Sequence, residues 1–176
     1  MGVSKNDGFP SPVKLAAVFA LMASFAFAET VHQSVPADKF QTGDGKNAIT
    51  AGAAESKTIE GAGGGLVARL KGSVQQWGFV NCWFGLPAPQ GKSIIRFHIY
   101  VDSDKVAKTL LYIRGQGGAD MVGELKLPAD AKEKTFVDVD VPVDAKEEWS
   151  GLVIKKAEAS NAPGFWIQSV SVVLPD

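Results

Sequence analysis

The residues of this chain that could do chemistry are aromatic and polar side chains recurring at every second position in three apolar segments. Alternate side chains of a β-strand point to opposite sides, so one side of each segment would be aromatic and polar. Aromatic rings stack on the apolar face of a sugar, and amide, guanidinium and imidazole groups bond to its hydroxyls. If the three strands lie in one sheet, the predicted ligand-binding face holds Trp77, Asn81, Trp83, Arg96, His98, Tyr100, Tyr112 and Arg114.

The same side chains have a plainer interpretation as an ordinary sheet surface. The N-terminal segment, a loop or a second chain could cover the aromatic residues. Arg96 and His98 could be ordinary polar residues on the solvent-facing side of a sheet. Large aromatic side chains left on a solvent-facing surface usually mark contact with a partner. The alternation therefore leaves two interpretations open: a ligand-binding face, and an ordinary sheet surface whose aromatic residues are covered by other parts of the protein or by a second chain.

Asp138 and Asp140 are the carboxylates whose spacing could support catalysis. They lie two residues apart on one side of a strand, which separates their Cβ atoms by about 7 Å, near the carboxyl spacing of glycosidases. An alternating Val-Asp strand, however, needs polar residues on its wet side for solubility alone. Residues 61–65 (GAGGG) lack the Lys-Ser/Thr of a phosphate loop and are a turn. We predict no catalytic residues and no enzyme.

Cysteine and histidine are too scarce to build a metal site. The chain has one cysteine and two histidines, with no cluster at ligand spacing, so we predict neither a metal nor a cofactor. A single cysteine cannot form an internal disulfide. Cys82 alternates with Val80, Phe84 and Leu86, so we expect a small buried hydrophobe rather than a reactive thiol.

The first 28 residues have the three zones of a secretory signal peptide. Met1–Lys14 is polar and carries two lysines, Leu15–Phe27 is the apolar run LAAVFALMASFAF, and Ala26-Phe27-Ala28 fits a cleavage site. The run is shorter than the about 20 residues of a membrane-spanning helix, although an uncleaved anchor is the alternative. We expect cleavage after Ala28 and a periplasmic or extracellular mature protein.

Composition points to one soluble globular domain after the leader. The chain has 176 residues, 45% of them hydrophobic, and a net charge of −1. That balance argues against phosphate-backbone binding, which needs clustered Lys and Arg, so no nucleic-acid partner is expected. No later segment is apolar enough to span a membrane. Residues 29–64 are expected to add a short strand near Ala48–Thr50 and loops to a sandwich core over 65–176.

From Leu66 onward the hydrophobic pattern is that of β-strands. Turn signals recur about every 8–12 residues, as in sandwiches and barrels. Residues 132–134 and 143–148 are charged and are expected to be loops. We predict an all-β, two-sheet antiparallel β-sandwich (jelly roll) with strands over 66–70, 75–86, 93–102, 109–114, 121–127, 135–141, 149–155 and 165–174.

Two segments carry a family resemblance. GKSIIRFHIYVDSD (91–104) resembles a central strand of galactose-binding-like β-jelly rolls, the fold of many carbohydrate-binding modules, and FWIQSVSVVLP (165–175) is similar to their last strand. The resemblance covers about residues 65–175 and implies a non-catalytic module that binds carbohydrate or another cell-surface polymer. Such domains often hold calcium through an acidic residue that falls at Gln168 here, and an amide is a weaker ligand, so we expect no calcium.

Two alternatives to polymer binding stay open. The chain could be a structural or protein-interaction domain of the cell envelope, with another protein on its aromatic face. It could also be a polysaccharide-active enzyme using Asp138 and Asp140. Fold analogy by itself does not establish function.

Overall fold

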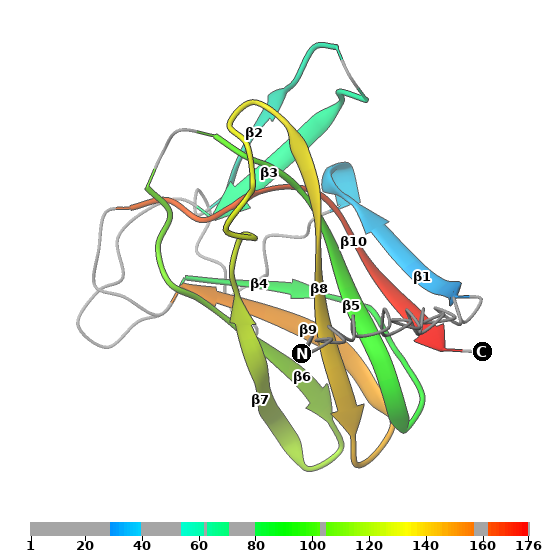
Figure 1. Cartoon of the computed structure of the whole chain (residues 1–176). Helices are drawn as coiled ribbons and strands as arrows, with labels where there is room; N and C mark the ends of the chain where they lie inside the picture. Colours follow the sequence, from blue (N-terminus) through cyan, green and yellow to red (C-terminus); the bar gives the residue numbers. More distant parts are fainter. Residues whose placement is uncertain are drawn as a thin grey trace, which may run out of the picture.

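The computed structural model describes residues 29–39, 54–61, 63–70, 80–102, 105–156 and 162–175. These parts form two antiparallel sheets packed face to face, with one 3₁₀ turn at Ala37–Lys39 as their helical element (Figure 1). The predicted all-β, two-sheet sandwich is therefore confirmed. The leader, Trp77 and the strand expected at 48–50 lie outside the described residues.

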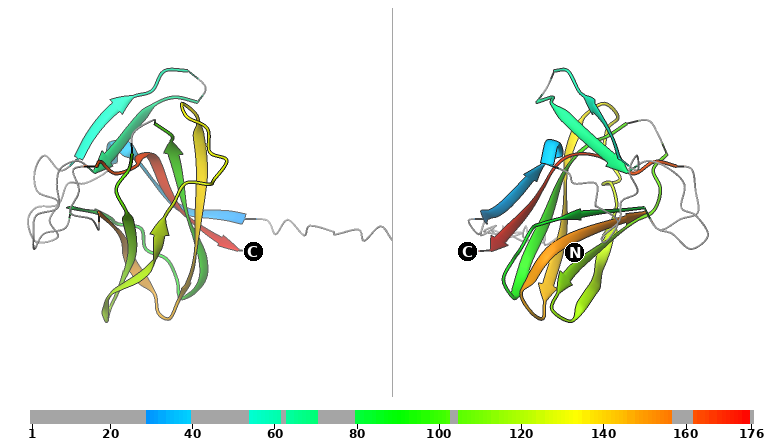
Figure 2. Two further views of the ribbon diagram at one scale, coloured as in Figure 1. Left: turned by 60° about the vertical axis from the view of Figure 1, so that its left-hand side comes forward. Right: turned by 180° about the vertical axis from the view of Figure 1, so that it is seen from behind.

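The larger sheet contains both ends of the described chain. Its central strand β10 pairs with β5 on one side, with β1 along most of its length, and with β3 through Ile167 and Ala68. Figure 2 shows the β2–β3 hairpin extending beyond the end of the sandwich. Its strands are β1 (Glu29–Pro36), β2 (Ala54–Thr58), β3 (Leu66–Leu70), β5 (Gly91–Tyr100), β8 (Phe136–Ala145) and β10 (Trp166–Pro175).

The smaller sheet has the order β4, β9, β6, β7. Gly118, at φ 131°, begins the second strand of the tight β6–β7 hairpin, a backbone conformation that favours glycine. The strands are β4 (Val80–Phe84), β6 (Thr109–Gly115), β7 (Gly118–Leu125) and β9 (Trp149–Lys156).

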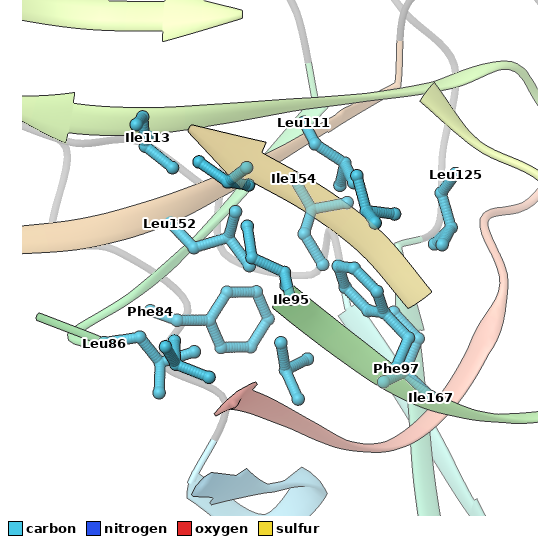
Figure 3. Close-up of a cluster of buried hydrophobic side chains, with 14 of the residues drawn as sticks. Phe84, Leu86, Ile95, Phe97, Leu111, Ile113, Leu125, Leu152, Ile154 and Ile167 are labelled. Carbon is cyan, nitrogen blue, oxygen red and sulfur yellow. The ribbon is translucent and has the colours of Figure 1, made fainter. Parts of the chain in front are cut away.

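The core lies between the sheets and follows the predicted alternation. In β5, Ile95, Phe97 and Ile99 are buried while the residues between them are half-buried. They meet apolar side chains of β4, β6 and β9, including Phe84, as Figure 3 shows. Cys82 is buried in the same core, which confirms its interpretation as a small hydrophobe. Alternation thus sorts inside from outside correctly along these strands.

Three local features refine the expectations from sequence. β1 and β2 were not predicted as strands, because most of their side chains are exposed or half-buried and lack apolar alternation. Val143–Ala145, expected in a loop, forms the end of β8. The turn over 61–65 is confirmed: it joins β2 to β3, and the amide of Ile59 donates to the carbonyl of Gly65. Within the described ranges, no helix has the length and apolarity to cross a bilayer.

Candidate functional site

The eight residues predicted to share one face are divided between two sheets. Arg96, His98 and Tyr100 lie on β5 in the larger sheet, whereas Tyr112 and Arg114 lie on β6 in the smaller one. Trp77 and the side chains of Asn81 and Trp83 lie outside the described residues, and β4 belongs to the smaller sheet. The expected single face is therefore wrong, because alternation sets a residue's side of a strand but not the sheet that the strand joins.

The outer face of the larger sheet brings the three β5 residues against β8 and β10. Antiparallel pairing places residues of neighbouring strands side by side on the same face. Neighbouring strands lie about 4.8 Å apart, so residues paired across β10, β5 and β8 form short rows of three close neighbours. Reading across β10, β5 and β8, the rows are Trp166–Tyr100–Phe136, Ser169–His98–Asp138 and Ser171–Arg96–Asp140.

Three rings gather on this face. The ring centroids of Tyr100 and Phe136 are 5.3 Å apart with the planes tilted by 58°. The His98 ring stacks on Phe136 at 4.9 Å and an interplanar angle of 2°. All three side chains are half-buried, so part of each remains open to solvent. We call His98, Tyr100 and Phe136 the aromatic cluster.

Sequence reasoning missed Phe136 although a signal was present. Phe136 has the same parity as Asp138 and Asp140, so its outward direction follows from the strand pattern. Its nearness to Tyr100 does not follow, because that depends on the pairing of β5 with β8.

Trp166 extends the first row but is covered by cations. The Lys57 ammonium lies 4.3 Å from its ring centroid, and the Arg69 guanidinium lies 4.1 Å away. Lys57 also lies 5.3 Å from the Tyr100 ring and forms an ion pair with Asp102, while Arg69 pairs with Glu55. Cation–π contacts of this kind hold the β2–β3 hairpin against β10. Trp166 therefore packs beside the aromatic cluster, but its own ring is covered and is not available for stacking on a ligand.

Hydrogen-bonded polar pairs occupy the other two rows. His98 Nδ1 lies 2.6 Å from Asp138 Oδ1. Arg96 donates two hydrogen bonds to the Asp140 carboxylate, at 2.7 and 2.6 Å, and a third to Glu29 at 2.9 Å. The hydrogen bonds to Asp140, and with them the one to Glu29, raise the pKa of the Arg96 guanidinium, although burial acts in the opposite direction. Asp140 is thus the partner of the Arg96 guanidinium and Asp138 the partner of the His98 imidazole, both on an open sheet face.

The outer face of the smaller sheet holds the remaining predicted residues. Tyr112 is half-buried, and the Lys155 ammonium lies 5.1 Å from its ring centroid. Arg114 is exposed, and its backbone carbonyl accepts a hydrogen bond from Ser150. Met121 is paired with Tyr112 across β6 and β7 and is 62% exposed. This face is apolar at its centre and lies on the opposite side of the sandwich from the aromatic cluster.

The calcium site of the resembling domains does not fit the residues present. Gln168 Nε2 donates to the backbone carbonyl of Gly63 at 3.3 Å, so this amide ties β10 to the β2–β3 turn. A carboxylate would be the ligand of choice for calcium. In the part of the chain that the structure describes, no three His, Cys, Asp or Glu side chains are grouped to hold a metal.

Comparison with known proteins identifies the fold. No family model and no curated protein sequence matches this chain. The solved family 35 carbohydrate-binding module from Clostridium thermocellum matches with a TM-score of 0.54 and 11% identity, covering 85% of this chain and 99% of that one. A carbohydrate-binding module of Cellvibrio mixtus lichenase 5A, in complex with cellotriose, matches with a TM-score of 0.52 and 16% identity, covering 84% and 100%.

A third similar structure belongs to a marine laminarinase. The C-terminal family 6 carbohydrate-binding module of a laminarinase from Zobellia galactanivorans matches with a TM-score of 0.52 and 12% identity, covering 81% of this chain and 98% of that one. The resemblance to carbohydrate-binding-module-like β-jelly rolls is thus confirmed at the level of fold. Identities this low transfer no residue roles.

Proposed function

We propose that this protein is an exported, non-catalytic carbohydrate-binding module that holds a polysaccharide on the outer face of its larger sheet. The observation that carries the proposal is the half-open aromatic cluster of His98, Tyr100 and Phe136, on a fold shared with carbohydrate-binding modules. Ring faces left partly open on a sheet surface suit the apolar side of a sugar ring. The ligand would be a carbohydrate or another cell-envelope polymer.

The arrangement supplies both parts of sugar recognition. The rings of Tyr100 and Phe136 offer stacking surface, and His98 adds a third ring. Lys57 and Asp102 border the cluster with groups that can bond to hydroxyls. Because an open sheet face buries little of its ligand, affinity for a single site should be modest. The repeated units of a polymer offer many equivalent sites, which raises the apparent affinity of a single module only by a statistical factor.

Two observations support an exported, non-catalytic role. The predicted leader ends at Ala28, and β1 begins at Glu29, so cleavage there would leave every described strand intact. The candidate catalytic carboxylates Asp138 and Asp140 are engaged by His98 and Arg96. Export is tested by expressing the chain with its own leader and sequencing the N-terminus of the exported protein. We expect Glu29 as the first residue; an intact leader in the membrane fraction would contradict cleavage, and full-length protein left in the cytoplasm would contradict export.

Binding is tested with the exported protein, insoluble polysaccharides and two alanine variants, Tyr100→Ala and Phe136→Ala. Removing about 50 Å² of ring contact, at about 25 cal/mol per Å², costs about 1.3 kcal/mol, a tenfold loss of affinity for each variant. Tyr112→Ala is the matched control, because it removes a half-buried aromatic ring from the opposite sheet. Unchanged binding by the first two variants, or loss in the control, would move the site off the aromatic cluster. Sugar release over time would instead indicate an enzyme.

The outer face of the smaller sheet favours a second candidate function, protein contact within the cell envelope. Met121 is largely exposed beside Tyr112, and methionine adapts readily to varied partner surfaces. Met121→Lys would disrupt such a contact without touching the aromatic cluster. If the variant loses association with the cell envelope but keeps polysaccharide binding, both faces function. If it loses neither, the protein-contact candidate is rejected.

A further inference from the structure

Lys134 has an unusual backbone conformation for a lysine. Its φ angle is 61°, and in the part of the chain that the structure describes it is the single residue other than glycine with a left-handed backbone. In this conformation the Cβ of an L-amino acid crowds the following carbonyl oxygen, so glycine is the residue that fits best. The sequence therefore carries a lysine side chain at a position where the backbone disfavours one.

Main-chain hydrogen bonds hold the turn that contains Lys134. The amide of Lys134 donates to the carbonyl of Val101 at 2.8 Å, and the amide of Val101 donates to the carbonyl of Thr135 at 2.9 Å. Glycine in place of Lys134 would keep both bonds, because each joins main-chain atoms. The turn by itself therefore does not explain the lysine, and residues in such conformations are concentrated at functional sites.

The turn places Lys134 beside the aromatic cluster. Lys134 precedes Phe136 by two residues, so their Cα atoms are at most about 7 Å apart. Its hydrogen-bond partner Val101 directly follows Tyr100, which is paired with Phe136 across β5 and β8. The Lys134 side chain is exposed, and its flexible four-carbon stem allows the ammonium to approach a ligand resting on the two rings.

The Lys134 ammonium also has hydrogen-bond donors to spare. Lys57, the cation on the Tyr100 side of the cluster, is paired with Asp102. Among the residues that the structure describes, no carboxylate lies within ion-pair distance of Lys134. An ammonium offers three donors and no acceptor, so it suits a ligand that presents oxygen acceptors.

We infer that Lys134 is a ligand-binding residue of this face, and that its ammonium donates hydrogen bonds to oxygen atoms of a polysaccharide resting on Tyr100 and Phe136. The inference rests on the proposed function and adds a residue to the same site. Hydroxyl and carboxylate oxygens both supply the acceptor that an ammonium needs. One hydrogen bond of this kind strengthens binding by about two- to tenfold.

Three substitutions separate the ammonium from the backbone. Lys134→Met keeps an unbranched stem but removes the charge and the donors, so it should weaken polysaccharide binding by about two- to tenfold. Lys134→Gly should weaken binding by the same factor, while the melting temperature stays equal or rises by up to about 4 °C because glycine relieves the crowding. Lys134→Arg keeps a cation with donors and should bind within about twofold of the wild type.

The assay is affinity gel electrophoresis of the exported protein, with polymer-free gels to correct for the change in charge. Hydroxyethylcellulose and carboxymethylcellulose share a backbone but differ in acid groups, as do arabinoxylan and glucuronoxylan. An equal loss of affinity for both forms in Lys134→Met would show that Lys134 binds hydroxyl oxygens. A larger loss for the acidic form, narrowing in about 0.5 M NaCl, would show that it binds carboxylates.

Lys146→Met is the matched control for the loss of a positive charge. Lys146 is an exposed lysine at the other end of β8, ten residues and about 33 Å from Phe136. This variant should bind every polymer as the wild type does. A loss equal to that of Lys134→Met would show a general effect of charge and overturn the inference.

Tyr100→Ala separates this inference from the proposed function. If Tyr100→Ala loses binding while Lys134→Met and Lys134→Gly bind as tightly as the wild type, the role of Lys134 is refuted and the proposed function stands. If no polymer retards the wild type, the proposed function fails and the role of Lys134 fails with it.

Discussion

Cys82 allows a quantitative test of the core. Burial on the inner side of β4 raises the pKa of its thiol to about 12, from an ordinary value of 9.0. At pH 8 an ordinary thiol is about one-tenth thiolate, whereas a thiol with a pKa of 12 is about one part in ten thousand. Only the thiolate attacks a disulfide reagent. Native Cys82 should therefore react about a thousandfold more slowly than the unfolded chain, even before steric access is considered.

The assay adds an aromatic disulfide reagent at pH 8 and follows release of its coloured thiol, first in buffer and then in about 6 M guanidinium chloride. We expect slow reaction in buffer, limited by unfolding, and rapid stoichiometric reaction in denaturant. Cys82→Ala should give no signal in either condition, since it removes the single cysteine. Reaction in buffer within tenfold of the denatured rate would show that Cys82 faces outward and that the inside–outside assignment of β4 is wrong.

The same pKa sets a pH dependence of stability whose sign is fixed. The unfolded chain ionises this thiol above pH 9, whereas the folded protein keeps its proton until about pH 12. The contribution of Cys82 to stability is therefore complete below pH 9 and is lost as pH rises from 9 to 12, by about 1.4 kcal/mol per unit. Urea unfolding at pH 8 and 10.5 should show a loss about 2 kcal/mol larger in the wild type than in Cys82→Ala.

Other substitutions test the core, the ion pairs and the turn. Phe97→Ala, in the fully buried row of β5, should lower the free energy of unfolding by about 3–5 kcal/mol in urea titrations; a loss below 1 kcal/mol would contradict its burial. Arg96→Lys keeps the positive charge but loses the paired hydrogen bonds to the Asp140 carboxylate. We expect the free energy of unfolding to fall by at most about 1 kcal/mol, and the difference to disappear near 1 M salt. Gly64→Ala would drive a Cβ into the Ile59 carbonyl and should lower the melting temperature, whereas Gly117→Ala meets only ordinary contacts and should not; equal effects would refute the turn geometry.

The sequence predicts a strand of this protein only where apolar and polar side chains alternate along it. In β5, the alternation of Ile95, Phe97 and Ile99 with polar neighbours predicted the buried side correctly. In β1, most side chains are exposed, so no apolar pattern reveals the strand, and its place beside β10 comes from backbone pairing. Backbone hydrogen bonds are nearly independent of side-chain type, which is why such a strand is invisible to pattern analysis.

In the candidate site, too, the sequence predicts the direction of a side chain but not which strands pair. The outward direction of Tyr100 and Tyr112 follows from parity, but their sheets differ, and their faces lie on opposite sides of the sandwich. Phe136 joins Tyr100 only because β8 pairs with β5. Pairing partners are chosen by contacts between residues far apart in the chain, which no local pattern encodes.

The sequence by itself determined the all-β character, the inner and outer sides of the principal strands, and the burial of Cys82. These properties depend on the two-residue period of a strand and on the removal of apolar surface from water. Only the tertiary structure decided which aromatic residues meet, and that Lys57, Arg69 and Arg96 are each held by a carboxylate. Those contacts depend on strand order and register, which are set by the packing of the whole chain.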